Sequence, residues 1–291
     1  MRVHLVDGTY ELFRAHFSKG PSRTDPAGRD VKATVGIVAN LLRLLADPRE
    51  AVTHLAVAFD NPIESFRNAR FAGYKDSSQV DPALLAQFDG AEQAVRALGV
   101  TVWSMDHYEA DDALATAAAR YAGRAAQVRI LTPDKDLGQA VRGDQVVQVD
   151  RLRDREFDEA GVVDRSGVSP PSIPDLLALV GDTADGIPGL PGFGAKSAAA
   201  VLARYGHLED IPSDGARWDL EVRGAQRLAT TLLERFEDAL LYRDLATLRT
   251  DVPLDEDLDA LAWDGVPQAA FLAWCDQVGA TGLRERPHRW A

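Results

Sequence analysis

The first half of the chain alternates between short apolar runs and longer stretches with helical periodicity. The apolar runs cover residues 3–6, 54–59, 99–103 and 128–131. Continuous apolar runs of this length are typical of strands buried on both faces of a parallel sheet. The helical patterns between them cover residues 34–45, 84–98 and 111–121. This strand–helix alternation predicts an α/β fold with a mainly parallel sheet.

The pattern changes after about Asp150, where a polar stretch rich in turn formers begins. From there on, the apolar periodicity is helical. The expected helices cover residues 173–180, 195–205, 223–242 and 269–278. A segment rich in glycine and proline separates the first two of them, and the tail after Asp251 is acidic. We therefore predict an α/β domain over residues 1–165 and a helical domain over residues 166–291.

Composition narrows the class of protein only slightly. With 291 residues and 46% hydrophobic residues, the chain has enough apolar surface for a full core. The single cysteine, Cys275, excludes an internal disulfide and suits a reducing cytoplasm, where we expect the protein to act. The N-terminal segment is too short and too acidic for a signal peptide, and no apolar run is long enough to span a membrane.

Acidic residues follow the expected strands or cluster in short motifs. The nine candidates are Asp7, Asp60, Glu109, Asp111, Asp112, Asp134, Asp136, Asp182 and Asp185. Ligands of parallel α/β sheets gather at the carboxyl ends of the strands, which is where the acids that follow strands fall. For any one of these acids alone, a helix cap, a turn or a solvated surface is the more common role. The set as a whole indicates a shared site.

Three local arrangements bring these acids close together. In residues 109–112, three acids crowd the first turn of an expected helix, where acids also complement the helix dipole. In residues 134–136, two acids alternate just past a strand, so both are expected to face one cavity. In residues 182–185, two acids are three positions apart, which predicts that they share one face of a helical turn.

So many converging carboxylates repel one another unless some are protonated or cations neutralise them. Mg²⁺ prefers oxygen ligands and takes only one or two carboxylates directly while it keeps several waters, so a set this large suits two ions. Two such ions about 4 Å apart can activate a water and stabilise a leaving oxygen in phosphodiester hydrolysis. Histidines number only six and none lies beside these acids, which disfavours zinc.

Short motifs surround these acids in a fixed order along the chain. They are Val6-Asp7-Gly8, Phe59-Asp60, Ser65-Phe66-Arg67, Gly73-Tyr74-Lys75, and the stretches 108–112, 132–137, 181–189 and 192–196. The ordered set resembles the flap endonuclease / 5′ nuclease family, and most of all the N-terminal 5′ nuclease domain of bacterial DNA polymerase I and its stand-alone relatives. The likeness runs from the first residues to about Asp251.

The resemblance implies a PIN-like, mainly parallel sheet flanked by helices, followed by a helical part with a helix–three-turn–helix DNA-binding motif. It implies a 5′-3′ exonuclease and structure-specific flap endonuclease that hydrolyses DNA in replication and repair. Two Mg²⁺ ions, which Mn²⁺ can replace, would serve as cofactors. The five acids from Asp7 to Asp112 correspond to the first metal cluster, and the four from Asp134 to Asp185 to the second.

Basic residues of the family have counterparts here as well. By resemblance, Lys75 and Arg67 correspond to catalytic residues near the scissile phosphate, and Arg14 to a DNA-binding arginine. Two departures stand out. Gly186 occupies a position where relatives usually carry asparagine, and residues 76–81 lack the lysines and arginines of the arch that covers the active site in relatives.

A glycine-rich loop leads into the helix expected at residues 195–205. Gly189, Gly192 and Gly194 let the backbone approach a phosphate, and Lys196 and Ser197 lie in the first turn of that helix. A nucleotide-binding P-loop is excluded because one residue separates the last glycine from the lysine and no strand precedes the loop. In isolation, a structural turn is the more common role. By resemblance, the loop grips duplex DNA and holds a K⁺ ion.

The net charge of −13 argues against a general nucleic-acid binder. Without the nine candidate metal ligands the net charge is −4. DNA with 5′ ends, flaps or junctions, including RNA–DNA primers, therefore remains the expected partner. We expect the enzyme to be a monomer and to bind this DNA with modest affinity. Tyr10, Phe13 and Phe17 could stack on a displaced base, but their helical spacing favours core packing. The alternative functions are a PIN-like ribonuclease and a non-catalytic protein that binds DNA junctions.

Overall fold

The structure, a computed structural model, describes residues 1–291 and divides them into two compact units. Unit 1 comprises residues 1–65, 76–132 and 250–291, and unit 2 comprises residues 66–75 and 133–249. The two units are interleaved along the chain, because the segment 66–75 belongs to unit 2 and the tail from residue 250 belongs to unit 1. The division into domains 1–165 and 166–291 stays a prediction. No helix in either unit is both long enough and apolar enough to cross a membrane.

Unit 1 contains four parallel strands in the order β3-β2-β1-β4. They are β1 (Arg2–Asp7), β2 (His54–Asp60), β3 (Thr101–Met105) and β4 (Gln127–Leu131). The predicted parallel arrangement is confirmed. The chain builds outward from β1 to β3 and then returns to the other side of β1 for β4, so the strand order reverses between β1 and β4. Such a reversal places a crevice at the carboxyl ends of these two strands.

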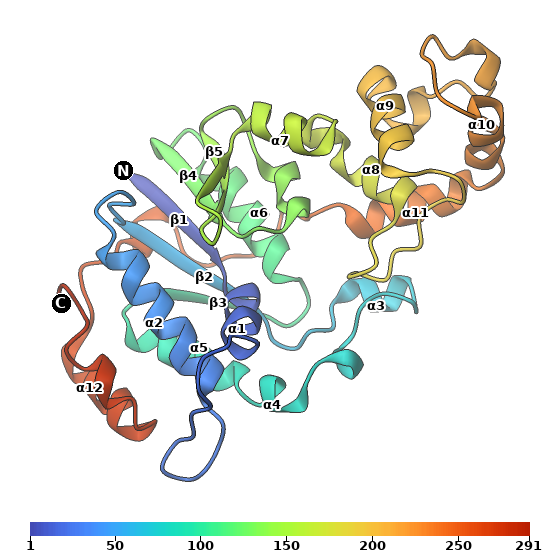
Figure 1. The fold of residues 1–291 in the computed structure, drawn as a ribbon. Helices are drawn as coiled ribbons and strands as arrows, with labels where there is room; N and C mark the ends of the chain where they lie inside the picture. The colour runs from blue at the N-terminus through green and yellow to red at the C-terminus, as the bar shows by residue number, and fades with distance from the viewer. The chain divides into compact units, whose positions relative to one another are not determined.

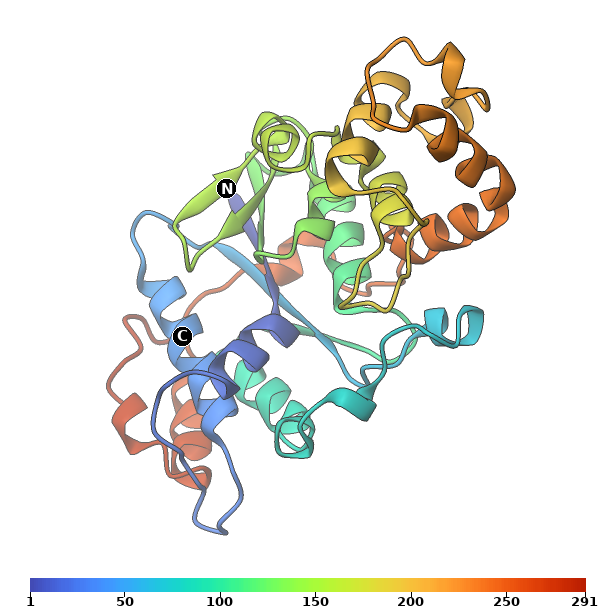
Figure 2. The ribbon, with the colours of Figure 1, turned by 45° about the vertical axis from the view of Figure 1, so that its right-hand side comes forward.

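Helices of unit 1 cover both faces of these strands (Figures 1 and 2). They are α1 (Gly8–His16), α2 (Lys32–Ala46), α4 (Pro82–Leu85), α5 (Phe88–Ala97), α6 (Ala110–Tyr121) and α12 (Gln268–Gln277). On one face α1, α2 and α5 pack together, whereas α6 packs on the other. The apolar residues of β1, β2 and β4 are almost completely buried between these layers, as the continuous apolar runs predicted, whereas Val102 and Met105 of β3 are half-buried.

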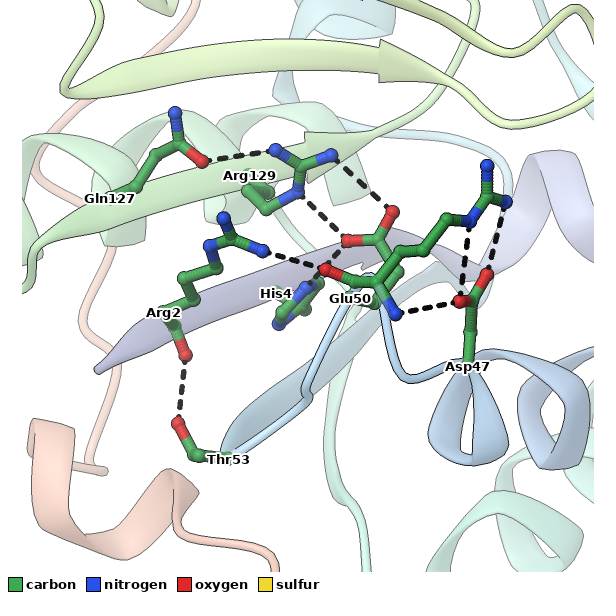
Figure 3. Close-up of polar contacts among 8 residues, drawn as sticks. Arg2, His4, Asp47, Glu50, Thr53, Gln127 and Arg129 are labelled. Carbon is green, nitrogen blue, oxygen red and sulfur yellow. Dashed lines mark hydrogen bonds and ion pairs between the residues drawn. The ribbon is translucent and has the colours of Figure 1, made fainter.

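At the amino ends of β1 and β4, a closed cluster of charged residues is formed (Figure 3). The completely buried His4 lies 3.0 Å from the Glu50 carboxylate through Nε2, and Arg129 reaches the same carboxylate at 2.9 Å. The hydrogen bond with His4 and the charge of Arg129 lower the pKa of Glu50 to about 2, whereas burial lowers the pKa of His4. Charges at this end of the strands are therefore neutralised within the chain.

Unit 2 combines an antiparallel strand pair with a set of helices around a separate apolar core. Its strands are β5 (Val146–Asp150) and β6 (Arg155–Phe157). Its helices are α3 (Phe66–Arg70), α7 (Glu159–Ser166), α8 (Ile173–Val180), α9 (Ala195–Tyr205), α10 (Ala225–Glu234) and α11 (Phe236–Ala246). The sequence predicted one helix over residues 223–242, but the backbone turns at Arg235 (φ −120°, ψ 29°) and separates α10 from α11.

Within unit 2, the segment 66–75 lies against the loop that follows α8. Gly186 has a φ of +75°, and a Cβ atom at this position would lie 2.1 Å from the carbonyl oxygen of Gly73. Next to this contact, the Lys75 amide donates to the Asp185 carbonyl oxygen at 3.0 Å. Gly186 is therefore required both by its left-handed backbone conformation and by the close approach of another backbone segment.

Replacing Gly186 with alanine should destabilise the protein more than the same change at Gly206. Gly206 also has a positive φ, +84°, but a Cβ there meets no atom within 4 Å. The Gly206→Ala variant should lose about 1 kcal/mol from backbone strain alone, whereas Gly186→Ala should lose about 2 kcal/mol or more because the segment 66–75 must also move. Urea unfolding of both variants measures this difference, and equal losses would contradict the proposed close packing.

Candidate metal centre

The carboxylate of Asp7 is fixed where β1 ends and α1 begins. Asp7 is the last residue of β1, is only 6% exposed, and caps α1 by accepting a hydrogen bond from the Tyr10 amide at 2.7 Å. Its second oxygen accepts from the hydroxyl of Thr132, just past β4, at 2.9 Å. Asp7 is thus held at the reversal point between β1 and β4.

The end of β2 is tied to the start of α6 by a second acid. Asp60, the last residue of β2, accepts from the Ala110 amide at 2.6 Å, and its own amide donates to the Thr9 hydroxyl at 2.8 Å. The neighbouring Glu109 is buried and accepts from the Ser65 hydroxyl at 2.7 Å. The carboxylates at the ends of β1 and β2 and at the start of α6 therefore share one edge of unit 1.

The other two acids of this group have different surroundings. Asp112 is completely buried and accepts from the Glu109 amide at 3.0 Å, which closes a capping box at the start of α6. Asp111 is half-buried in the same helical turn. Asp112 thus has a clear structural role as a helix cap, in addition to the expected role near a metal.

In unit 2, four acids influence one another electrostatically. Asp134 begins the 3₁₀ helix Lys135–Ala140 and accepts from the Asp136 amide at 3.0 Å. Asp136 is 9% exposed, and its Oδ1 atom is buried without a hydrogen-bond partner. Burial first, and then the charges of Asp134, Asp185 and Asp182, raise the pKa of Asp136 to about 8. Because the charges of Asp134, Asp182 and Asp185 all act on Asp136, the four acids lie close enough to influence one another.

The loop that carries Asp182 and Asp185 is not the helical turn expected from their spacing. Asp182 and Ile187 form an antiparallel bridge, with reciprocal backbone hydrogen bonds of 2.9 and 2.8 Å. The Asp182 carboxylate accepts from the Ala184 amide at 2.7 Å and from the Asp185 amide at 3.3 Å. The sequence prediction was wrong here because aspartate stabilises a tight turn through its own side chain as readily as it starts a helix.

Lys75 is held beside one of these acids. Its ammonium group lies 2.9 Å from the Asp185 carboxylate and 5.7 Å from the centre of the Tyr74 ring. Asn68 donates to the Lys75 carbonyl oxygen at 2.8 Å, which fixes the backbone of this segment. The side chain is about one-quarter exposed, so the ammonium group remains accessible from solvent. The sequence motif thus places a cation next to the acids of unit 2.

Arg67 has surroundings that its sequence motif did not predict. It is 1% exposed, and its guanidinium donates to the carbonyl oxygens of Leu245 at 2.8 Å and of Thr247 at 3.0 Å. These contacts tie α3 to the carboxyl end of α11. A role in holding α3 fits them better than the expected contact with a scissile phosphate. Arg14 is likewise engaged, in an ion pair with Glu11 on the same helix.

The three glycines of the glycine-rich loop have different surroundings. A Cβ at Gly189 would lie 2.4 Å from the Gly181 amide nitrogen, so this glycine serves close packing. A Cβ at Gly192 would lie 3.5 Å from the guanidinium of Arg227, a basic residue of α10 that the sequence analysis did not select. Gly194 caps α9, and a Cβ there would meet no atom within 4 Å.

The first turn of α9 presents one bound and one exposed side chain. The Ser197 hydroxyl forms reciprocal 3.0 Å hydrogen bonds with the backbone of Gly194, which completes the helix cap. Lys196 is exposed and forms no ion pair, whereas Arg204 further along α9 is paired with Asp219. Of the side chains in this helix, Lys196 is thus the cation that remains available to a phosphate.

The sequence analysis gave no separate role to three polar residues that support the acids. Thr132 and Ser65 donate to Asp7 and Glu109, and Arg165 donates to Gln148 at 2.7 Å behind the acids of unit 2. The position of Thr132 directly after a strand could have indicated its role. No local signal marks Ser65 or Arg165, because their partners lie far away in the sequence.

The donors present fit hard divalent cations better than zinc. No three His, Cys, Asp or Glu side chains have the spacing of a complete ligand shell. Mg²⁺ takes one or two carboxylates and completes its shell with water, so it does not need such a group. The unpartnered oxygen of Asp136 and the raised pKa of its carboxyl group both indicate that a bound cation would stabilise the ionised form of this residue.

Two family models together match nearly the whole chain. Residues 2–167 match the model described as "5'-3' exonuclease, N-terminal resolvase-like domain", and residues 168–269 match "5'-3' exonuclease, C-terminal SAM fold". Among similar proteins, DNA polymerase I of Rhizobium leguminosarum is 37% identical over 98% of this chain, and DNA polymerase I of Bacillus caldotenax is 32% identical over 98%. The chain spans only 28% and 32% of the lengths of these two relatives.

Solved structures share the fold at lower sequence identity. A zinc-bound T5 5′-exonuclease is similar over 96% of this chain and 99% of its own, with a TM-score of 0.67 and 20% identity. The catalytic core of Rad2 in complex with a DNA substrate covers 96% of this chain and 88% of its own, with a TM-score of 0.61 and 16% identity. The fold is therefore a mostly parallel sheet flanked by helices, resolvase-like in its N-terminal part, with a helical SAM fold in its C-terminal part.

The stability of the metal-free protein should depend on pH through Asp136. The pKa of this carboxyl group is about 8 in the folded chain and near 3.8 when unfolded, so its contribution to stability is complete below pH 4 and is lost as pH rises through 8. In EDTA, the Asp136→Asn variant should be more stable than the parent at pH 9 by at least about 1 kcal/mol, or roughly 2–4 °C in Tm, and equal to it at pH 4.

The exposed Asp164 on α7 provides the matched control, because it has no hydrogen-bond or ion-pair partner and the same change to asparagine should leave Tm unaltered at both pH values. A Tm difference between the Asp136→Asn variant and the parent that stays constant from pH 4 to 9 would contradict a shifted pKa.

Proposed function

The chain belongs to the 5′-3′ exonuclease family, and from this premise we propose that it is a divalent-metal-dependent nuclease that cuts DNA at 5′ ends and flap junctions. The proposal concerns the activity of this chain, which corresponds to only part of its DNA polymerase I relatives. Its substrates are DNA strands with free 5′ ends, flaps or junctions, and RNA–DNA primers belong to the same class.

The observation that carries the proposal is the electrostatic state of the acids in unit 2. Burial, and then the charges of three neighbouring acids, raise the pKa of Asp136 to about 8, so ionisation of this aspartate is costly unless a cation is bound. Together with the acids fixed at the ends of β1 and β2, this supports two Mg²⁺ ions, one for each set of carboxylates, with Mn²⁺ as a substitute. We propose Asp7, Asp60, Glu109, Asp111 and Asp112 for the first set and Asp134, Asp136, Asp182 and Asp185 for the second.

Divalent ions at such carboxylates lower the pKa of a bound water and stabilise charge on phosphodiester oxygens. The residues of this chain would hold and orient those ions. Hydrogen bonds from Tyr10 and Thr132 hold both oxygens of Asp7, and the Ala110 amide holds Asp60. Because these donors are fixed before any ligand arrives, the carboxylates need little reorganisation when a substrate binds.

Lys75 is the cation that we propose to act on the phosphate. Its ammonium group is partly exposed and is paired with Asp185, so a cation bound by that carboxylate would free the lysine for another anion. A lysine beside a phosphodiester stabilises the charge that develops as the bond breaks. Arg67 contributes indirectly in this proposal, because it holds α3 at the start of the same segment.

Contacts to the duplex backbone are proposed for the start of α9. The exposed Lys196 offers a positive charge to a phosphate, and the first turn of α9 offers backbone amides that have no acceptor within the helix. Arg227 stands beside Gly192 and adds a second exposed cation. A K⁺ ion in this loop, suggested by the resemblance, belongs to the same proposal.

The Asp134→Ala variant should reduce Mg²⁺-dependent cleavage of a labelled 5′-flap DNA by at least about 100-fold, because a metal ligand is lost. Its DNA affinity should stay within a few-fold of the parent, since Asp134 repels rather than binds phosphate. Gel analysis of the cleavage products and fluorescence anisotropy of the labelled DNA measure the two quantities. Asp164→Asn, an exposed acid outside both sets, is the control.

The same assay separates the alternative functions. EDTA should stop cleavage by the parent, and cutting of RNA with equal efficiency would favour a PIN-like ribonuclease instead. Binding of the flap without any Mg²⁺- or Mn²⁺-dependent cleavage would favour a non-catalytic junction-binding protein. Undiminished turnover by Asp134→Ala would refute the metal role of this residue.

Lys196→Ala should weaken DNA binding to a similar extent for all sequences and reduce the log–log salt slope by about 1, because one phosphate contact is lost. Arg204→Ala on the same helix is the matched control and should have a smaller effect, since that guanidinium is already paired with Asp219. For the parent we expect a slope shallower than about −6, which corresponds to a small phosphate footprint. Equal effects of the two variants would contradict the assignment.

A further inference from the structure

Arg165 of α7 is a half-buried arginine that forms no ion pair. Its guanidinium lies over the Phe157 ring of β6, with 4.5 Å between the central carbon atom and the ring centre. The Nε atom is buried without a hydrogen-bond partner. Burial lowers the pKa of Arg165, although the charges of Asp134, Asp136 and Asp150 favour its charged form. A cation that is withdrawn from water without an ion pair needs other contacts to hold it in place.

The hydrogen bonds of Arg165 lead to the backbone between two of the proposed metal ligands. Its Nη2 group donates to the Gln148 side-chain oxygen at 2.7 Å and, more weakly, to the Lys135 carbonyl oxygen at 3.4 Å. Gln148 lies on β5, is completely buried, and donates through Nε2 to the Asp134 carbonyl oxygen. These two backbone carbonyl groups are consecutive, so both lie between Asp134 and Asp136 along the chain. Arg165 and Gln148 together therefore hold the backbone that separates these two acids.

Arg165 fixes the orientation of the Gln148 amide. A glutamine amide accepts hydrogen bonds at its oxygen and donates them at its nitrogen, whereas an arginine only donates. The Gln148 oxygen must therefore face Arg165, which leaves the NH₂ group to face the Asp134 carbonyl oxygen. Because Gln148 is completely buried, bulk solvent does not compete for either contact. Without Arg165, the amide would be free to turn its oxygen toward Asp134, and the hydrogen bond to that backbone would be lost.

Arg165 also packs against the 3₁₀ helix Lys135–Ala140, which contains Asp136. A Cβ atom at Gly138 in this helix would lie 3.0 Å from the Nη2 atom of Arg165, so the glycine leaves the space that the guanidinium occupies. The guanidinium thus lies against the helix as well as over the Phe157 ring. A planar group with these contacts has few alternative positions, so its hydrogen bonds are in place before a ligand arrives.

The charge of Arg165 and its hydrogen bonds should act on a bound cation in opposite directions. Like charges repel, so the positive charge alone would weaken the binding of a divalent ion to Asp134 or Asp136. The hydrogen bonds should strengthen this binding, because two carboxylates that repel each other need a fixed backbone to keep the spacing that an ion requires. The sign of the change on removing Arg165 therefore separates a positioning role from a purely electrostatic one.

We propose that Arg165 and Gln148 are positioning residues, which fix the spacing of Asp134 and Asp136 and so prepare the second set of carboxylates for a divalent cation. The inference rests on the proposed function, because it takes these acids to be metal ligands. In this arrangement neither Arg165 nor Gln148 touches the ion or the DNA. They act through the backbone carbonyl groups of Asp134 and Lys135.

The test measures Mn²⁺ binding to the full chain without DNA, from the electron paramagnetic resonance signal of free Mn²⁺. Asp134→Ala identifies which bound ion belongs to the second set. Arg165→Met and Gln148→Met should each weaken the binding of that ion by about 10-fold, the lower limit for residues that orient metal ligands, and leave the other ion unaffected. Arg155→Met is the matched control, because it removes an exposed positive charge from β6 and should change binding by less than about two-fold.

Three further measurements separate positioning from general structural damage. In the double variant of Arg165→Met and Gln148→Met, the loss should stay at about 10-fold rather than reach about 100-fold, because both residues act through one chain of hydrogen bonds. Arg165→Lys should weaken binding as well, since lysine keeps the charge but lacks the planar guanidinium that stacks on Phe157 and donates to both acceptors. With DNA, the Mg²⁺ concentration for half-maximal flap cleavage should rise by the same factor in each single variant, while kcat at saturating Mg²⁺ stays within about two-fold.

The proposal is overturned if Arg165→Met or Gln148→Met binds Mn²⁺ as tightly as the parent or more tightly. It is also overturned if the losses of the two single variants multiply, or if Arg165→Lys keeps the affinity of the parent. Circular dichroism and Tm values check that each variant folds, and if Gln148→Met does not fold, Arg165→Met and Arg165→Lys decide the question. The proposed function fails in a different way, because the parent chain itself would then bind no Mn²⁺, or would bind it without cutting the flap.

Discussion

Carboxylates that are held close together away from bulk water repel one another, and the rest of the structure has to accommodate this repulsion. In unit 1, hydrogen bonds offset the repulsion between the carboxylates. Asp7 accepts from an amide and a hydroxyl, and Asp60 accepts from an amide at the start of a helix. In unit 2, Asp136 keeps a buried oxygen without a donor, and its pKa is about 8. Hydrogen bonds thus hold the acids of the first set, whereas the second set contains a buried carboxylate oxygen without a donor.

The two ends of the parallel strands show how surroundings separate a structural acid from a functional one. At the amino ends, Glu50 is enclosed by His4 and Arg129, and its pKa is about 2 (Figure 3). All the positive charge it needs is supplied by the chain, so no ligand is required. The acids at the carboxyl ends of β1 and β2 accept hydrogen bonds from amide and hydroxyl groups, which fix the geometry of the carboxylates. A divalent ion is the ligand that completes such an arrangement.

The sequence was sufficient for the parallel strands and for the acids at their ends, because both follow from local patterns. A buried strand needs a continuous apolar run, and the residue after it necessarily lies at the carboxyl edge of the sheet. The environment of Arg67 was beyond such reasoning, because its partners Leu245 and Thr247 are about 180 residues away. The turn at Asp182 and the break at Arg235 also escaped prediction, because a short polar segment is compatible with several backbone conformations.

Gly186 illustrates an intermediate case. The sequence marked it as a departure from a family that usually carries asparagine at this position, but gave no reason for the difference. The backbone conformation explains it in part, because asparagine and glycine are the residues that most readily adopt a positive φ. The close approach of the Gly73 carbonyl oxygen, at 2.1 Å from a Cβ position, explains the rest. The residue type at position 186 is thus decided by a contact with a distant segment, and the sequence around this position cannot predict that contact.

An enzyme that concentrates acids around metal ions must still hold a polyanion. Lysine and arginine side chains that contact phosphates add to DNA affinity because counterions are released from the DNA. Close to the carboxylates, however, such a side chain would form an ion pair with them, as Lys75 does with Asp185. Hydrogen bonds from backbone amides avoid this competition, because an amide carries no formal charge. The amides in the first turn of α9 have no acceptor within the helix and are groups of this kind. In the proposed function, they would let a chain of net charge −13 contact a phosphate while its carboxylates stay available to ions.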